Sequence, residues 1–335
     1  MKILFLLKHT HSSKHYSNCG DGAGGLLNST KFVADMLTKE RITTKIVVVT
    51  DNNDIDREVT VFRPDVVVIE ALWVVPSKFD VLKLLHPTVK WIVSIHSNIP
   101  FLAVEGIAIE WITGYIDRQV YVAFNALEIA VDIQSLFPRD SYILYLPNYY
   151  PPVTFPHTPL PGLHIGCFGA IRPMKNQLLQ AIAAIKYADR QNVFMSFHVN
   201  ASRCEQEGGS VLANLRSLFS VTRHELVEHD WMLHSDFLRL MAMMDISMAV
   251  SFSETFCITA ADAVVTGTPL VCSDQIPWAD SNSIVPTTNT QSMVETIGKL
   301  LKNPKKSNKP NLRNLTRYVS KSRQLWLDSL KALSK

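Results

Sequence analysis

The sequence predicts an α/β protein made of two Rossmann-like domains, because apolar runs of strand length alternate with helical stretches in two separate series. A proline-rich segment, 147–161, divides the two series and holds six prolines in fifteen residues. Neither a helix nor a central strand tolerates prolines at this density, so we expect a linker there. The chain has 335 residues with 47% hydrophobic content, which is enough to bury two cores.

The first series contains five short apolar runs of the kind found in buried parallel strands. These runs are residues 2–7, 44–50, 65–71, 89–96 and 119–124. A helix is expected over 25–39, between the first two runs. Parallel strands need such crossovers, so the alternation predicts a parallel sheet in a first domain over residues 1–150.

The second series repeats this rhythm after the linker and predicts a second parallel sheet. Its expected strands are residues 163–169, 193–200, 225–230, 245–251 and 269–274. Its expected helices begin near Asn176 and cover 208–219, 234–244 and 256–266. The last segment, 312–335, has apolar residues at helical spacing and is expected to form a terminal helix.

The formal net charge of +3 hides an asymmetry along the chain. Residues 299–335 hold 11 lysines and arginines and one acid, Asp328, a balance of +10, which leaves −7 for residues 1–298. A basic run of this kind is either a solvated helix face or a patch that contacts membrane lipid or another polyanion. Both interpretations stay open at this point.

Cysteine usage and hydropathy bear on the compartment. The five cysteines are scattered without paired spacing, which fits buried thiols in a reducing compartment better than a disulfide framework or a zinc site. No apolar run approaches the roughly 18–20 residues needed to cross a bilayer. The start of the chain, MKILFLLKHTH, is typical of a first strand rather than a signal peptide. We expect a cytoplasmic protein, peripheral at a membrane if the basic tail binds lipid.

A glycine-rich stretch, GDGAGG at 20–25, has the spacing of dinucleotide-binding proteins. In that fold the glycines follow the first strand immediately, but here Gly20 lies twelve residues beyond Lys8, which argues against a nicotinamide cofactor. The glycines instead end a long loop ahead of a helix, where backbone N–H groups can approach a phosphate or sugar closely. A merely flexible loop is the alternative.

Charged residues follow two expected strands of the second series, at the carboxyl ends where open α/β sheets bind ligands. Arg172 and Lys175 can clamp a diphosphate, or they are ordinary surface charges. Glu254 precedes a helix expected from about Phe256, where it can accept hydrogen bonds from sugar hydroxyls or cap the helix. Asp262, inside that helix, can bind a ribose or lie on a half-buried face.

In chain order these residues resemble the GT-B nucleotide-sugar glycosyltransferases, specifically the retaining family 4 group, over most of the chain. The family's E-x7-E signature corresponds to Glu254 and Asp262, followed by Gly-Thr-Pro at 267–269. The family's basic pair, glycine loop and histidine correspond to Arg172, Lys175, Gly24, Gly25 and His96. Asp262 departs from the pattern because it is one methylene shorter than the family's glutamate, which puts the ribose contact in question.

This resemblance implies two Rossmann-like domains that face each other across a cleft. Residues 1–150 would form the acceptor-side domain and residues 151–311 the nucleotide-sugar-binding domain, with the helix 312–335 crossing back to the first. The implied reaction moves a hexose-like sugar from a nucleoside diphosphate to an unidentified glycan, lipid or modified nucleic acid, with retention. It would need no cofactor and no divalent metal. The base would lie near 227–232, and the segments 9–25 and 97–111 would line the acceptor side.

The resemblance also implies roles for single residues. Arg172 and Lys175 would bind the donor diphosphate and stabilise the leaving nucleotide. Glu254 would hold the sugar hydroxyls, Asp262 the ribose, and His96 the donor sugar from the other domain. The remaining donor-binding positions would be Gly24, Gly25, Thr255, Phe256, Cys257 and Ile258, with the backbone at 256–258 capping the phosphate.

The histidine-containing loop and an acid-rich turn allow other interpretations of the sequence. His9, His11 and His15 lie in a glycine-flanked loop without a nearby carboxylate or thiolate, so they would hold a metal poorly. The Asp-x-Asp within 51–56 is typical of the GT-A fold, but that fold would leave the second series of strands unexplained. An exposed, acid-rich turn at the start of a helix accounts for these residues instead. A GT-B sugar-nucleotide epimerase and a non-catalytic nucleotide-sugar-binding protein stay as alternatives.

Overall fold

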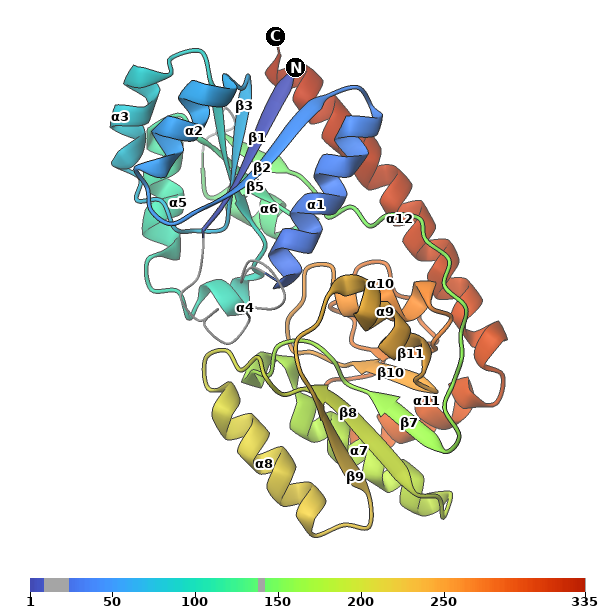
Figure 1. Cartoon of the computed structure of the whole chain (residues 1–335). Helices are drawn as coiled ribbons and strands as arrows, with labels where there is room; N and C mark the ends of the chain where they lie inside the picture. The colour runs from blue at the N-terminus through green and yellow to red at the C-terminus, as the bar shows by residue number, and fades with distance from the viewer. Residues whose placement is uncertain (9–23, 138–141, 335) are drawn as a thin grey trace. The chain divides into compact units, whose positions relative to one another are not determined.

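The protein divides into two compact units, each with its own sheet and core (Figure 1). The computed structural model describes residues 1–8, 24–137 and 142–334. Unit 1 comprises Met1–Pro151 with Val319–Lys335, and unit 2 comprises Pro152–Tyr318. The first two glycines of the 20–25 stretch and the histidines at 9, 11 and 15 lie outside the described residues.

Unit 1 contains a six-stranded parallel sheet in the order β2-β1-β3-β4-β5-β6. Its strands are β1 (Lys2–Lys8), β2 (Thr43–Val49), β3 (Val66–Glu70), β4 (Lys90–Ile95), β5 (Tyr121–Phe124) and β6 (Ile143–Tyr145). The first five confirm the predicted runs within two residues at each end. The sixth was not predicted, because three residues beside a proline-rich segment carry too little periodicity to be recognised.

Helices cover both faces of this sheet. They are α1 (Gly24–Lys39), α2 (Asp54–Phe62), α3 (Lys78–Leu85), α4 (Ile99–Leu102), α5 (Ala108–Asp117) and α6 (Leu127–Ser135). Along β1, Leu4 and Leu6 belong to the core that packs on α2, α3, α5 and α6, whereas Ile3 and Phe5 belong to the core on the α1 face. Both faces are therefore apolar, which is why the sequence shows continuous hydrophobic runs instead of alternation. The acid-rich turn at 51–56 leads into α2, as expected.

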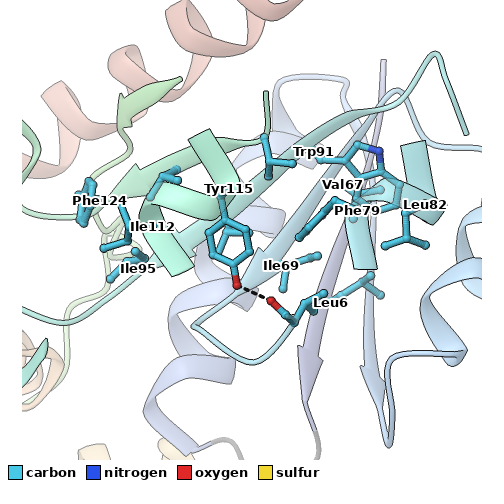
Figure 2. Packing of buried hydrophobic residues seen from close by; sticks show 14 of the residues in the cluster. Leu6, Val67, Ile69, Phe79, Leu82, Trp91, Ile95, Ile112, Tyr115 and Phe124 are labelled. Atoms are coloured by element: carbon cyan, nitrogen blue, oxygen red, sulfur yellow. Dashed lines mark hydrogen bonds between the residues drawn. The ribbon is translucent and has the colours of Figure 1, made fainter. Parts of the chain in front are cut away.

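Aromatic side chains fill the first of these cores (Figure 2). Phe79 meets Trp91 and Tyr115 edge to face, with ring centroids 5.7 Å and 5.6 Å apart. The Tyr115 hydroxyl is buried and donates a hydrogen bond to the carbonyl of Val74. This bond satisfies the only polar atom that Tyr115 brings into the core, and burial raises the pKa of that hydroxyl.

The C-terminal helix α12 (Pro304–Leu333) contributes its last part to unit 1. Trp326 is 3% exposed, packs in the core on the α1 face, and donates from Nε1 to the carbonyl of Pro147 at 2.8 Å. The helix begins at residue 304 instead of near 312. Proline is favourable at the first helical position, so Pro304 can start the helix, and Pro310 is accommodated inside it.

Unit 2 contains a five-stranded parallel sheet in the order β11-β10-β7-β8-β9. Its strands are β7 (Leu163–Gly166), β8 (Met195–Asn200), β9 (Glu225–His229), β10 (Ile246–Ala249) and β11 (Leu270–Cys272). Its helices are η2 (Pro173–Lys175), α7 (Gln177–Arg190), α8 (Gly208–Ser220), α9 (His234–Ala242), α10 (Ile258–Val265) and α11 (Thr290–Leu301). All five strands of the second series are confirmed.

The strand order of unit 2 places a switch point between β7 and β10. β7 is first in the chain but lies in the middle of the sheet, with β8 and β9 on one side and β10 and β11 on the other. At such a point the loops after the two neighbouring strands diverge and leave space for a ligand. Across the parts of the chain that the structure describes, no helix combines the length and the apolar character needed to span a membrane.

Candidate active site

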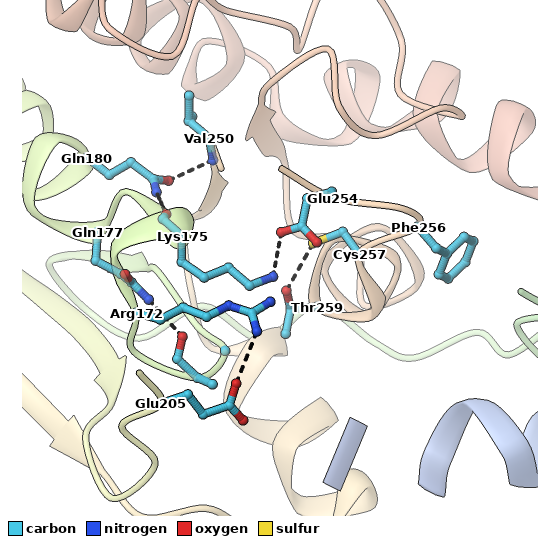
Figure 3. A network of polar contacts seen from close by, with 12 residues as sticks. Arg172, Lys175, Gln177, Gln180, Glu205, Val250, Glu254, Phe256, Cys257 and Thr259 are labelled. Atoms are coloured by element: carbon cyan, nitrogen blue, oxygen red, sulfur yellow. Dashed lines mark hydrogen bonds and ion pairs between the residues drawn. The ribbon is translucent and has the colours of Figure 1, made fainter. Parts of the chain in front are cut away.

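The loops that follow β7 and β10 are tied together at this switch point. Asn176 adopts a left-handed φ of 58°, and its side chain donates to the carbonyls of Val250 at 3.0 Å and Thr287 at 2.8 Å. Gln180 accepts from Val250 N at 2.9 Å and donates to the carbonyl of Lys175 at 2.8 Å (Figure 3). These buried amides fix the backbone on both sides of Lys175. The amide side chains of Asn176 and Gln180, at the start of α7, could have indicated such contacts from the sequence, but no role was predicted for them.

Lys175 and Glu254 meet in the resulting pocket. Lys175 Nζ lies 2.5 Å from Glu254 Oε1, and the side chains are 15% and 7% exposed. Burial would raise the pKa of Glu254, but the charge and hydrogen bond of Lys175, helped by Ser251 and Arg172, hold that pKa below its usual value. The pocket therefore contains an ionised carboxylate beside an ammonium group.

Small neutral side chains complete the pocket lining. Cys167, Gln177, Cys257 and Thr259 are among the residues around Lys175 and Glu254. Burial raises the pKa of Cys167 and of Cys257 to about 12, so both are neutral thiols at physiological pH. The charge of the pocket thus comes from the ion pair.

Arg172 lies on the same loop as Lys175 and also has a carboxylate partner. Its Nη1 atom is 3.1 Å from Glu205 Oε2, and the Arg172 side chain is 19% exposed. Figure 3 shows the two cations side by side, with Glu205 and Glu254 as their respective partners. The structure brings together the basic pair and the first acid of the predicted signature. Glu205 was not predicted, because nothing in its local sequence marks it.

The segment 255–258 connects Glu254 to α10. Phe256 is 1% exposed, its ring packs against Trp278 and Tyr318, and its carbonyl accepts from Trp278 Nε1 at 2.9 Å. The helix expected from Phe256 begins two residues later, at Ile258, because Cys257 has a left-handed φ of 63° that an α-helix does not contain. Thr255 is half-buried. Phe256 anchors this turn and Ile258 opens the helix.

Asp262 lies inside α10 and is 1% exposed. Its Oδ1 atom is 2.7 Å from Nε2 of His234, the first residue of α9. Burial lowers the pKa of His234, but the hydrogen bond and charge of Asp262 outweigh this effect and leave the pKa raised. Sequence reasoning gave His234 no role, since a pair 28 residues apart has no local signature.

The predicted site residues of unit 1 lie after β4 and at the start of α1. His96 follows β4, with Nε2 at 2.6 Å from Glu70 Oε2 and 3.1 Å from Ser94 Oγ. Its Nδ1 is 3.4 Å from the Asn125 side-chain nitrogen. The two glycines, 24 and 25, open α1; the first has a φ of 33°, and a Cβ atom on the second would meet no atom within 4 Å.

Solved structures similar to this chain have low sequence identity to it, and no protein-family model and no curated protein matches the sequence. Sucrose-phosphate synthase from Thermosynechococcus elongatus aligns with a TM-score of 0.70 at 9% identity, over 99% of this chain and 98% of its own. HepE from Anabaena, in complex with UDP and glucose, aligns with a TM-score of 0.67 at 13% identity, over 99% of each chain.

TarM from S. aureus, in a complex that contains UDP, aligns with a TM-score of 0.62 at 14% identity over 78% of this chain. The alignment spans only 54% of TarM, about half of its length. At these identities the likeness shows the fold. The chain has the GT-B fold, with two α/β units built on parallel sheets, as the sequence predicts.

Proposed function

We propose that this protein is a glycosyltransferase that moves a hexose-like sugar from a nucleoside-diphosphate donor to an acceptor hydroxyl, with retention at the anomeric carbon. The observation that carries the proposal is the Lys175–Glu254 pair, beside Arg172, at the switch point of unit 2. The UDP in the TarM complex and the UDP and glucose in the HepE complex support a nucleotide sugar as donor.

In this proposal Arg172 and Lys175 bind the diphosphate and Glu254 accepts hydrogen bonds from the sugar hydroxyls. The bond between the anomeric carbon and the phosphate oxygen breaks, and its electron pair stays on the phosphate, where the two cations stabilise the charge. The acceptor oxygen forms the new bond to the anomeric carbon, and its proton passes to the leaving phosphate.

The remaining site residues would hold the other parts of the donor. Backbone N–H groups at Cys257 and Ile258 would cap the phosphate where α10 begins. Asp262, oriented by His234, would accept from the ribose hydroxyls. His96 would bind the donor sugar, with its ring fixed by Glu70.

The transfer is proposed to need no divalent metal, since two side-chain cations can supply the charge that a metal would otherwise bring. Chelation with EDTA should therefore leave the rate of sugar transfer unchanged. A rate that falls with EDTA and returns with added Mg²⁺ or Mn²⁺ would overturn this part of the proposal.

The exposed face of α12 is proposed to contact an anionic membrane surface. Residues four apart are neighbours on a helix surface, and five exposed cations follow this spacing in a stripe that winds gradually around α12: Lys305, Lys309, Arg313, Arg317 and Lys321. Such a stripe suits a peripheral protein acting on a lipid acceptor. The thiols at 167, 204, 257 and 272 are free, which suits the cytoplasmic location predicted above.

Liposome flotation tests this contact. Vesicles with phosphatidylserine should retain the wild-type protein at low salt, and changing all five cations to glutamine should release it. Binding to duplex DNA alone would redirect the proposal to a nucleic-acid acceptor, and binding to neither would leave the stripe as a solvated face and overturn it.

The donor is tested by calorimetric titration and product analysis with UDP-, GDP- and ADP-sugars. We expect one donor to bind and to be slowly hydrolysed, and Glu254→Gln to abolish hydrolysis. Glu58→Gln is the matched control, because Glu58 lies 2.9 Å from Lys45 in unit 1 and is 15% exposed. If no nucleotide sugar binds the wild type, the proposal falls.

A further inference from the structure

The loops after β7 and β8 are joined beyond the ends of their strands. Ile171 N donates to the carbonyl of Arg203 at 2.8 Å, and Glu205 N donates to the carbonyl of Ile171 at 2.9 Å. These bonds form an isolated parallel bridge between Ile171 and Cys204. Arg172 and Glu205 each follow a bridge residue directly, so their backbones are held in a fixed register.

A glycine makes this approach possible. Gly208, the first residue of α8, is buried, and a Cβ atom added to it would lie 2.0 Å from the carbonyl oxygen of Ile171. No side chain fits at that distance, so any other residue would push the two loops apart.

Glu205 lies between two guanidinium groups. Its Oε2 atom is 3.1 Å from Arg172 Nη1, and its Oε1 atom is 2.6 Å from Arg203 Nη2 and 2.7 Å from Arg203 Nε. Arg203 thus contacts the carboxylate through two nitrogens, while Arg172 uses one. The Glu205 side chain is 30% exposed, and Arg172 and Arg203 are 19% and 25% exposed.

Arg203 is itself anchored on an aromatic ring. Its guanidinium carbon lies 4.6 Å from the ring centroid of Trp231, within the range of a cation–π contact. The backbone N–H of Trp231 donates to Ser202 Oγ at 2.7 Å, which ties the segment after β9 to the segment after β8. Trp231, Arg203, Glu205 and Arg172 therefore form a continuous series of contacts across three loops.

We propose that Glu205 is a positioning residue that fixes the Arg172 guanidinium for the donor diphosphate. Because Glu205 occupies Nη1, it sets the plane of the guanidinium group, and a planar group binds phosphate well only in a defined orientation. Arg203 and Trp231 hold the carboxylate in place. This inference rests on the proposed function, since it assigns Arg172 to the donor phosphates.

The sign of the effect separates positioning from simple electrostatics. A carboxylate near a diphosphate repels it, so charge alone predicts that removal of Glu205 tightens nucleotide binding. Positioning predicts the opposite result, because without Glu205 the Arg172 side chain loses its fixed orientation and pays more entropy on binding.

The test is a double-mutant cycle read by calorimetric titration, using whichever of UDP, GDP and ADP binds the wild type most tightly. Glu205→Ala should weaken binding about tenfold, within the range of coupling between contacting residues. In the Arg172→Ala background the same change should have no further effect. Glu58→Ala is the control, because Glu58 also lies between two cations, Lys45 and Arg57, but in unit 1.

Each result bears on the inference. Unchanged or tighter binding by Glu205→Ala would overturn it, and so would an equal loss in the presence and absence of Arg172, which would indicate an effect on the fold. If the wild type binds none of the three nucleotides, the proposed function fails first and this inference fails with it. If the wild type binds and the cycle shows no coupling, the inference alone is lost.

Discussion

Lys175 and Glu254 form their ion pair in a buried pocket, and such a pair is a costly way to stabilise a fold because both ions lose their hydration. Removal of one partner leaves the other charge buried alone. We therefore expect Lys175→Met to lower the free energy of unfolding by about 3–5 kcal/mol. Urea unfolding of the wild type and the variant measures this difference.

The double variant Lys175→Met/Glu254→Leu is the control for that experiment. With both charges gone, the site no longer holds an isolated ion, and stability should return to the wild-type value or above it, while sugar transfer stays absent. A double variant that is as unstable as the single one would show that the pair holds the fold together.

His234 offers a pH-dependent test of its contact with Asp262. Since its pKa in the folded protein is raised, the contact adds stability below the ordinary histidine pKa, and this contribution is lost as the pH rises through the folded value. The difference in unfolding free energy between wild type and His234→Gln should be larger at pH 6 than at pH 9. A difference that is constant with pH would contradict an ionic contact.

Residue types and their place after strands were enough to indicate the charged residues that the structure brings together, whose binding roles stay a prediction. Arg172, Lys175 and Glu254 each follow the end of an expected strand, and Asp262 lies inside the helix α10 that follows Glu254. Their partners were beyond sequence reasoning, because contacts such as Arg172 with Glu205, 33 residues away, depend on which loops the strand order brings together.

At the scale of elements, three neighbouring strands of unit 2 carry a connected series of histidines. His164 on β7, His198 on β8 and His229 on β9 are joined by contacts of 3.0 Å and 2.8 Å. His164 Nε2 lies 3.2 Å from the carbonyl of Pro161, to which it can only donate. With His164 donating from Nε2, its Nδ1 can accept from His198 Nε2, and His198 Nδ1 can accept from His229 Nε2.

This series makes unit 2 sensitive to acid. Burial, with smaller contributions from His229 and His164, lowers the pKa of His198 to about 3. Between the ordinary histidine pKa and that value the unfolded chain binds a proton that the folded chain does not, so stability falls as the pH falls. We expect a loss of about 2 kcal/mol between pH 7 and pH 5 from this residue.

The measurement is urea unfolding from pH 7 to pH 5, with hydrogen exchange of the amides in β7, β8 and β9 to assign the loss to unit 2. His198→Asn removes the titrating ring. The number of protons taken up on unfolding should fall by about one, so the unfolding free energy should depend less steeply on pH. An unchanged slope in the variant would mean that other groups account for the acid sensitivity.

Two adjacent glycines at the start of α8 allow a matched comparison. Gly208→Ala should cost roughly 1–3 kcal/mol, because its Cβ atom would collide with the Ile171 carbonyl. Gly209→Ala should stabilise the protein by roughly 0.5–1 kcal/mol, because its Cβ atom meets nothing within 4 Å and alanine favours the helix. Thermal unfolding of both variants measures these two effects. Equal shifts of the melting temperature in the two variants would contradict the prediction.

The existence of ten of the eleven described strands was predictable, and element boundaries were less so. The ten expected strands form because their apolar runs are long and uninterrupted. The start of α10 was misplaced because the left-handed backbone of Cys257 has no marker in the sequence. The start of α12 was misplaced because the prediction followed apolar residues at helical spacing from 312 onward, whereas the helix begins with Pro304 at its first position.

At the scale of the whole molecule, the cations and carboxylates proposed to bind the diphosphate, sugar hydroxyls and ribose of the donor all belong to unit 2. A nucleotide at one hundred times its dissociation constant should therefore stabilise that unit by about 2.7 kcal/mol. Hydrogen exchange with and without UDP should show protection in the loops after β7 and β10. Protection confined to unit 1 would contradict the assignment of the donor site.

The C-terminal helix has a consequence for how the chain is made. Trp326, Leu330 and Leu333 complete the core on the α1 face of unit 1, whose other buried members lie between residues 3 and 146. During translation the first sheet emerges early, but part of its α1 face stays uncovered until residues 319–333 have left the ribosome. A nascent chain interrupted before that point carries an open hydrophobic surface, which chaperones and proteases recognise.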